Sequence, residues 1–305
     1  MNQDLALSFI KEIKGQGLVV PQIEISKLGG LSFASVFTER PTEVMANSAS
    51  AGVDYNSDLA ITKALVEHFE RQVFSEGIAI GNPVCFRRHS DGVAAYPRSK
   101  INADTQAREN AYCEALERYV WARWWDDHSV GHTRTFFENS EFFCNEKFRI
   151  TIEDLNKIIS LDSISVIEPF FEESQNDVLI LFAAVKNFGY ISGGAAGPTD
   201  NRDEIFLRGL AELIRHGIAL SRFIETKQSP KTFYEKRLLL FGLGHGNESV
   251  NERLQNISNN NLKLPSLEFD NVIESKKYSG LITTHRCLFK DQPPFVDGDL
   301  ERLCL

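Results

Sequence analysis

The spacing of apolar residues along the chain predicts several strands and helices. Residues 2–14 carry apolar positions at helical spacing, and residues 18–25 and 31–38 are predicted as strands that a Gly29-Gly30 turn separates. Residues 58–74 form the next predicted helix, with a buried stripe at spacings of four, three and four. Further strands are expected at 164–169, 178–185 and 281–289, and further helices at 107–125, 152–159 and 202–223.

The predicted helix over 107–125 distributes its side chains unusually. Bulky residues take most of its circumference, whereas Glu114 and Arg118 lie on a face of small side chains that cover little and leave room. Glu117 lies nearer the bulky side, where burial of its carboxylate needs a compensating cation or hydrogen bond. The alternative is an ordinary i, i+4 ion pair worth about 0.2–0.5 kcal/mol. The small side chains are Ala107, Ala111, Ala115 and Ala122.

Composition and charge narrow the class of protein. The chain has 305 residues, a net charge of −9 and a pI near 5.4, which argues against broad binding of a phosphate backbone. Five scattered cysteines form neither a disulfide framework nor a zinc signature. The N-terminus lacks the pattern of a signal peptide, and no apolar run approaches the ~20 residues that span a bilayer. We expect a cytoplasmic protein that binds neither membrane nor nucleic acid.

Three segments share one plan, in which a loop of small residues precedes a helix with glutamate and arginine. The predicted loops are residues 48–52, 90–95 and 192–197. The intervals between the three segments differ, which excludes a solenoid of fixed period. The plan predicts three similar elements that converge on one place. The helix positions are Glu67, Glu70 and Arg71; Glu114, Glu117 and Arg118; and Arg208, Glu212 and Arg215.

These residue types suit a nucleotide with magnesium. Carboxylates are hard oxygen ligands for Mg²⁺, backbone N–H groups at helix N-termini favour phosphate, and arginines pair with phosphate oxygens. The alternative is a set of helices held together by Glu–Arg pairs. The chain has no Walker, protein-kinase or Rossmann glycine motif.

The three motifs, in their order, resemble those of the YcaO family from near Leu18 to the strand around Arg286. They are Lys63-Ala-Leu-Val-Glu67-His-Phe-Glu70-Arg71, then 91–95 with 114–118, then 194–196 with 208–215. The resemblance implies an α+β fold in which acidic helices converge on a Mg²⁺–ATP site. It further implies activation of a peptide-bond oxygen by phosphoryl transfer, which leads to an azoline or, with an external sulfur donor, a thioamide.

The resemblance also assigns expected roles to single residues. The expected Mg²⁺ ligands are Glu67, Glu70, Glu114, Glu117 and Glu212. The expected ATP contacts are Lys63, Arg71, Asp91, Arg118, Arg208 and Arg215. The expected catalytic residues are Glu70, Glu117 and Arg286.

Several departures from the family pattern leave the function open. Lys63, Asp91 and Arg215 stand where the family has serine, asparagine and glutamine, the interval between the first two motifs is short, and Pro293-Pro294-Phe295 is at most a remnant of a proline-rich end. A catalytically weakened subunit that binds a peptide or partner and scaffolds a modification complex is therefore the alternative to an enzyme.

The resemblance also bears on domains and partners. We expect one domain, with an extension over 1–17, a core over 18–290 and a tail over 291–305. No leader-binding domain is recognisable before the core, so a precursor peptide or protein substrate implies a separate leader-binding or sulfur-delivery partner. A homodimer is compatible with the sequence.

The other conspicuous side chains near the motifs are predicted to be structural. Two histidines on the motif helices are expected to be packed or solvated, and the tryptophans and two cysteines to be buried. They are His68, His216, Trp121, Trp124, Trp125, Cys113 and Cys287.

Overall fold

The computed structural model describes most of the chain, namely residues 5–37, 49–81, 90–172, 175–256, 258–295 and 300–301. The chain divides into two compact units. Unit 1 comprises Met1–Tyr112 with Glu268–Leu288, and unit 2 comprises Cys113–Leu267 with Phe289–Leu305. The boundary falls inside helix α3 (Ala103–Asp126), so this helix contributes residues to both units. That the chain forms a single domain stays a prediction.

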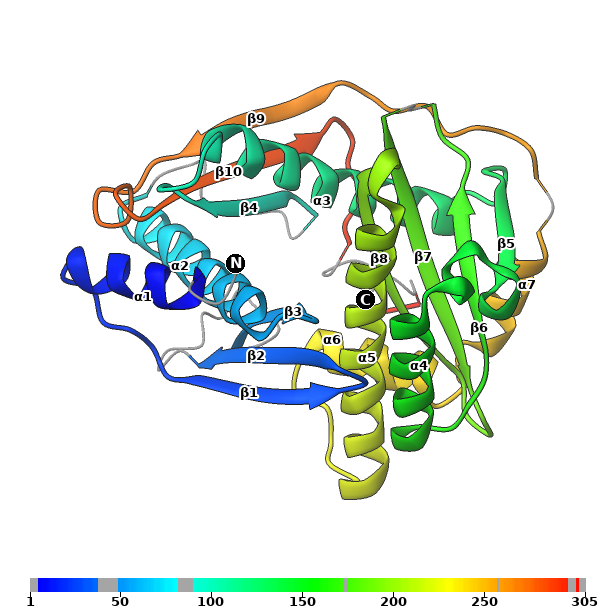
Figure 1. Ribbon diagram of the computed structural model, residues 1–305. Helices are drawn as coiled ribbons and strands as arrows, with labels where there is room; N and C mark the ends of the chain where they lie inside the picture. The colour runs from blue at the N-terminus through cyan, green and yellow to red at the C-terminus, as the bar shows by residue number, and fades with distance from the viewer. Residues whose placement is uncertain are drawn as a thin grey trace. The chain divides into compact units, whose positions relative to one another are not determined.

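Unit 1 is built around helix α2 (Ser57–Ala79), which lies between two three-stranded sheets (Figure 1). Its apolar residues pack against those of both sheets in one core that includes Val36, Phe69 and Val93. Helix α1 (Leu5–Gly15) packs on α2. The first sheet has the order β1 (Ile23–Leu28), β2 (Leu31–Phe37), β3 (Ala49–Asp54), and the second β4 (Gly92–Pro97), β10 (Ile282–Phe289), β9 (Leu267–Ile273).

Unit 2 is built on a four-stranded antiparallel sheet. The strands follow in chain order: β5 (His132–Phe136), β6 (Leu161–Pro169), β7 (Asn176–Val185) and β8 (Tyr190–Pro198). Helices α5 (Arg202–Thr226) and α4 (Glu146–Ile158) lie side by side, with α5 packed on β7 and β8 (Figure 1). The remaining helices are α6 (Phe233–Gly242), α7 (Asn247–Gln255) and short 3₁₀ turns at Phe137–Asn139, Glu141–Cys144 and Thr199–Asn201.

The expected α+β class is confirmed, and the core residues agree with the sequence. Trp121 and Trp124 are fully buried, and the buried thiols predicted at Cys113 and Cys287 are 5% and 0% exposed. The alanine face of α3 is closed rather than open, because its alanines are each 0% exposed. Helices α6 and α7 lie between the predicted helix 202–223 and the predicted strand 281–289, where the sequence predicts no helix. None of the described helices is both long and apolar enough to cross a bilayer.

The three small-residue segments are strands rather than the loops that the sequence predicted. They form most of β3, β4 and β8; residues 90 and 91 form a bend before β4, and residue 48 lies outside the described residues. The glycines serve close packing of helices on these strands. A Cβ on Gly52 would lie 2.0 Å from the Ala60 carbonyl oxygen of α2, and a Cβ on Gly193 would lie 2.4 Å from the Gly209 carbonyl oxygen of α5. At these two positions any side chain would collide with the backbone of the helix that packs on the strand.

Candidate functional site

In unit 2, helices α3 and α5 bring together most of the residues predicted in the second and third motifs. Arg118 donates from Nη2 to Glu114 Oε1 one turn earlier on α3. Glu117 of α3 is close enough to Glu212 and Arg208 of α5 for their charges to interact. We call these glutamates and arginines on the two helices the α3/α5 cluster: Glu114, Glu117, Arg118, Arg208, Glu212 and Arg215.

Glu117 is the most buried carboxyl of the α3/α5 cluster, at 7% exposure. Burial raises the pKa of Glu117 well above its usual value, and the nearby charge of Glu212 raises it further. Arg208 and Arg118 act in the opposite direction and do not offset the burial. A cation bound beside Glu117 would oppose this effect and favour the ionised carboxylate.

Glu212 lies at the outer edge of strand β8. Its Oε2 accepts the Gly194 N–H at 3.5 Å, and its Oε1 lies 3.4 Å from Arg215 Nη2. Burial raises the pKa of Glu212, while Arg215 and the Gly194 N–H oppose that rise. Because the Glu212 side chain is 32% exposed, we expect a smaller shift than at Glu117. Arg208 Nη1 donates to the Ala196 carbonyl on the same strand at 3.0 Å.

In unit 1, the glutamates of the first motif make the same kind of contact with edge strands. Glu67 Oε2 accepts the Ala51 N–H of β3 at 2.8 Å, and Glu70 Oε2 accepts the Ala95 N–H of β4 at 3.1 Å. Strands β3, β4 and β8 are each at the edge of their sheet, so they present N–H groups that need acceptors. A recurring role of these glutamates is therefore to accept a hydrogen bond from an edge strand.

The cations of the first motif pair within unit 1. Arg71 Nη2 donates to Glu67 Oε1 one turn away on α2. Lys63 Nζ lies 3.0 Å from Asp54 Oδ2, with its side chain 41% exposed. Lys63 is therefore the more accessible of the two cations. That Glu67 and Glu70 border one pocket with Glu114, Glu117 and Glu212 stays a prediction.

Asp91 and Arg286 form a buried ion pair. Arg286 Nε donates to Asp91 Oδ2 at 2.6 Å, and its guanidinium lies 4.8 Å from the centre of the Phe269 ring. The sequence placed both side chains at a nucleotide site but did not anticipate that they would pair.

Two further side chains of unit 2 belong beside the α3/α5 cluster and were not predicted. Burial raises the pKa of the Tyr234 hydroxyl on α6, and the charges of Arg215 and Glu212 reach it. The Phe295 ring lies 5.8 Å from the Arg118 guanidinium, and its carbonyl accepts from buried Arg237 at 2.7 Å. No sequence pattern links these residues to the motifs, apart from the remnant proline pair that precedes Phe295.

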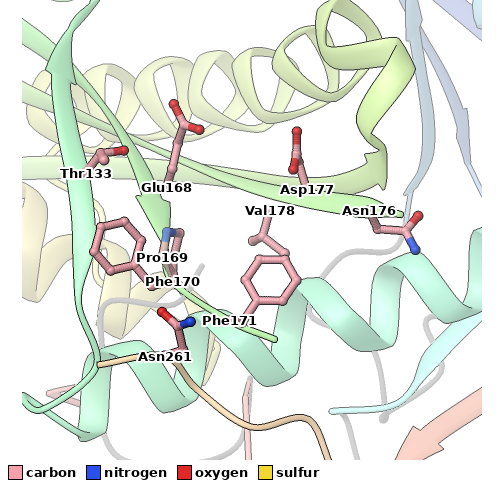
Figure 2. A pocket seen from close by; sticks show the side chains of 9 residues that line it. All are labelled: Thr133, Glu168, Pro169, Phe170, Phe171, Asn176, Asp177, Val178 and Asn261. Carbon is pink, nitrogen blue, oxygen red and sulfur yellow. The ribbon is translucent and has the colours of Figure 1, made fainter. Parts of the chain in front are cut away.

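A hollow of about 240 Å³ lies elsewhere in unit 2 and contains none of the predicted site residues (Figure 2). Two phenylalanines and two carboxylates line it. Glu168 and Asp177 are 3.0 and 2.6 Å from Arg202, which neutralises part of their charge. The lining residues are Thr133, Glu168, Pro169, Phe170, Phe171, Asn176, Asp177, Val178 and Asn261.

Comparisons with known proteins define the fold. No family model matches the chain, and no curated protein matches its sequence. Among solved structures, YcaO from Methanopyrus kandleri bound with AMPPCP and Mg²⁺ is 12% identical, with a TM-score of 0.58 over 97% of this chain and 93% of that chain. The E. coli microcin synthetase McbBCD complex with pro-MccB17 bound is 12% identical, with a TM-score of 0.61 over 90% of this chain and 89% of that chain.

This likeness shows that the chain has the fold of YcaO proteins. The resemblance predicted from three short motifs is therefore confirmed at the level of the fold. At 12% identity the likeness assigns no role to any single residue.

Proposed function

We propose that this protein is an ATP- and Mg²⁺-dependent enzyme that activates a backbone amide of a ribosomally made peptide. The α3/α5 cluster is the main support, because its carboxyls crowd together and Glu117 has a raised pKa that a cation would reverse. The fold adds support, since a YcaO structure of that fold was solved with AMPPCP and Mg²⁺.

The residues present suit a magnesium nucleotide. Mg²⁺ takes oxygen ligands and supplies charge neutralisation to phosphate groups. Glu117 and Glu212 of unit 2 would provide carboxylate oxygens, with Glu114 as a further ligand, and Arg118, Arg208 and Arg215 would contact phosphate. For unit 1 we propose separately that the carboxylates of Glu67 and Glu70 bind Mg²⁺ and that Lys63 and Arg71 bind phosphate. Glu117 and, in unit 1, Glu70 and Arg286 remain the proposed catalytic residues.

Calorimetry with AMPPCP is the direct test of the nucleotide site. We expect saturable binding that is tighter with Mg²⁺ than without, because unscreened carboxylates repel the triphosphate. Glu117→Gln and Glu212→Gln should each weaken Mg²⁺-dependent binding about tenfold or more, which corresponds to the loss of about 1.4 kcal/mol. Glu153→Gln on the exposed face of α4 is the matched control and should bind as wild type. Absence of binding in both conditions would contradict the proposal.

The product distinguishes azoline from thioamide chemistry. A precursor peptide rich in Cys, Ser and Thr, co-expressed with the protein, should lose the mass of one water for each azoline formed. A sulfur-for-oxygen exchange would instead raise its mass and indicate a thioamide. The pro-MccB17 bound in the McbBCD complex supports a peptide substrate and a separate partner protein here, which would supply leader binding or sulfur. A homodimer is a further proposal, which sedimentation of the purified protein would test.

A scaffolding subunit is the second candidate function. The buried pairing of Arg286 with Asp91 favours it, because each charge already has a partner within the protein. Reconstitution with a separate YcaO enzyme is the test. If this protein is a scaffold, it should raise the activity of the separate YcaO enzyme equally with and without the substitution Glu117→Gln. If it is itself an enzyme, the substitution should abolish its own turnover.

A further inference from the structure

Strand β10 places polar side chains of different kinds on its two faces. His285 and Cys287 are two residues apart and point to the same side, whereas Arg286 between them turns to Asp91. Asp270 of neighbouring β9 lies against the first pair. Its Oδ1 is 2.7 Å from His285 Nε2 and 3.8 Å from Cys287 Sγ. One donor atom from each of Asp270, His285 and Cys287 lies within 4.8 Å of the other two.

We propose that Asp270, His285 and Cys287 bind a divalent transition-metal ion, with zinc as the best fit. Thiolate, imidazole and carboxylate together suit this ion better than Mg²⁺, which prefers oxygen alone. Zinc–ligand distances of about 2.0–2.3 Å place tetrahedral ligands roughly 3.4 Å apart. The Asp270–His285 distance must therefore lengthen by about 0.7 Å, and the widest separation among the three ligand atoms must shorten. Rotation of the side chains provides both changes.

Burial at this place is unequal, which suits a site with one open position. His285 is 6% and Cys287 0% exposed, whereas the Asp270 side chain is 29% exposed. The carboxylate side thus admits the ion and leaves room for water as a fourth ligand. On binding, the Cys287 thiol forms a bond from sulfur to the metal and releases its proton to solvent, while His285 binds as the neutral imidazole.

Arg108 sets the affinity of the proposed site. Its Nε lies 2.9 and 3.0 Å from the two Asp270 oxygens, so its guanidinium competes with the metal for this carboxylate. The Arg108 side chain is 54% exposed and can exchange the carboxylate for water when a metal binds. All four residues belong to unit 1, and none belongs to the proposed nucleotide site. If Arg108 only held Asp270, His285 and Cys287 in place, its loss would weaken metal binding, whereas loss of a competing cation would tighten it.

Cobalt(II) titration of the full-length protein tests the site, because cobalt replaces zinc and its bond to thiolate absorbs in the near ultraviolet. Cys144→Ser serves as the parent protein, since Cys144 is an exposed thiol. We expect one equivalent of cobalt to produce the thiolate band. Cys287→Ser should abolish it, Asp270→Asn should weaken binding about tenfold or more, and Cys113→Ser, at a buried thiol of unit 2, should leave it unchanged.

Arg108→Gln gives the sharpest arm of this experiment. Removal of the competing cation should tighten cobalt binding several-fold and increase the rise in melting temperature that zinc produces. A band that persists in Cys287→Ser would overturn the proposal, as would no band in the parent or weaker binding in Arg108→Gln. Should Cys287→Ser fail to fold, His285→Gln takes its place, and an unchanged affinity in that variant would also overturn the site.

Discussion

Arg286 and Asp91 form an ion pair in the interior of unit 1, with the Arg286 Nε 2.6 Å from Asp91 Oδ2. The two side chains are 2% and 0% exposed. A buried pair of this kind depends on both members, since removal of one leaves the other charge without compensation. The pair also joins two distant parts of the chain, because Asp91 directly precedes β4 and Arg286 lies on the neighbouring strand β10.

The first prediction follows from this pair. Arg286→Met should lower the free energy of unfolding by about 3–5 kcal/mol, because the Asp91 carboxylate stays buried. Urea denaturation measures the change. The double variant Asp91→Asn with Arg286→Met should recover part of the loss, since no unpaired charge remains. If the double variant lost as much as the sum of the single variants, the two residues would act independently and the interpretation would be wrong.

The second prediction concerns Glu117, whose folded-state pKa is raised by burial and by Glu212. A carboxyl with a raised folded pKa stabilises the fold fully below its unfolded pKa of about 4.3, and this contribution is lost as the pH rises through the folded pKa. Glu117→Gln should therefore match wild type near pH 4 and become more stable than wild type at pH 8.

Glu114→Gln is the matched control for Glu117 on the same helix. Glu114 is paired with Arg118, so its replacement should cost about 0.2–0.5 kcal/mol. Thermal unfolding of both variants between pH 4 and 8, with and without Mg²⁺–ATP, provides the measurement. A Glu117→Gln protein that melts below wild type at pH 8 would show that the carboxylate is structurally required and would contradict this account.

The third prediction concerns two buried histidines, His68 in unit 1 and His216 in unit 2. Burial lowers the pKa of each to about 4, and His216 Nδ1 donates to the Ser192 carbonyl. Because the unfolded value is about 6.5, the unfolded chain binds more protons between pH 6.5 and 4. The free energy of unfolding should therefore fall as the pH is lowered from 6.5 to 4, by at most about 1.4 kcal/mol per pH unit for each histidine.

His68→Phe isolates the contribution of one histidine. This variant should show a shallower decline of unfolding free energy between pH 6.5 and 4.5 than wild type. His245→Phe, at an exposed turn after α6, controls for the replacement of an imidazole by a phenyl ring outside the core. An unchanged slope in His68→Phe would indicate that His68 titrates alike in the folded and unfolded states.

The fourth prediction concerns Arg202, whose guanidinium lies 2.6 Å from Glu141, 3.0 Å from Glu168 and 2.6 Å from Asp177. Arg202→Met should lower the unfolding free energy by about 1–3 kcal/mol, since three carboxylates then repel one another. Arg202→Lys should retain only part of the stability, because lysine lacks the planar fork.

Salt provides the check on that prediction. High ionic strength should narrow the difference between Arg202→Met and wild type, because it screens the repulsion at these partly exposed carboxylates. A difference that is independent of salt would point to lost packing of the arginine stem rather than lost charge.

The sequence alone determined the helices that carry the motifs, the buried aromatic residues and the three motifs. These features depend on local periodicity, since residues three and four apart on a helix share a face whatever lies opposite. The motifs in their order were also enough to indicate the fold. The local pattern does not show which strand lies at the edge of a sheet, and it therefore predicts loops for the segments rich in glycine and alanine.

The tertiary structure decided which groups each motif residue meets. Glu67, Glu70 and Glu212 accept hydrogen bonds from edge strands, and Glu117 meets Glu212. These contacts join residues far apart in the chain, and each depends on which strand lies at an edge and which helix packs there. The position of Glu117 on the bulky side of its helix indicated burial, but the charges of Glu212 and Arg208 that also act on its pKa come from α5, and only packing brings them there.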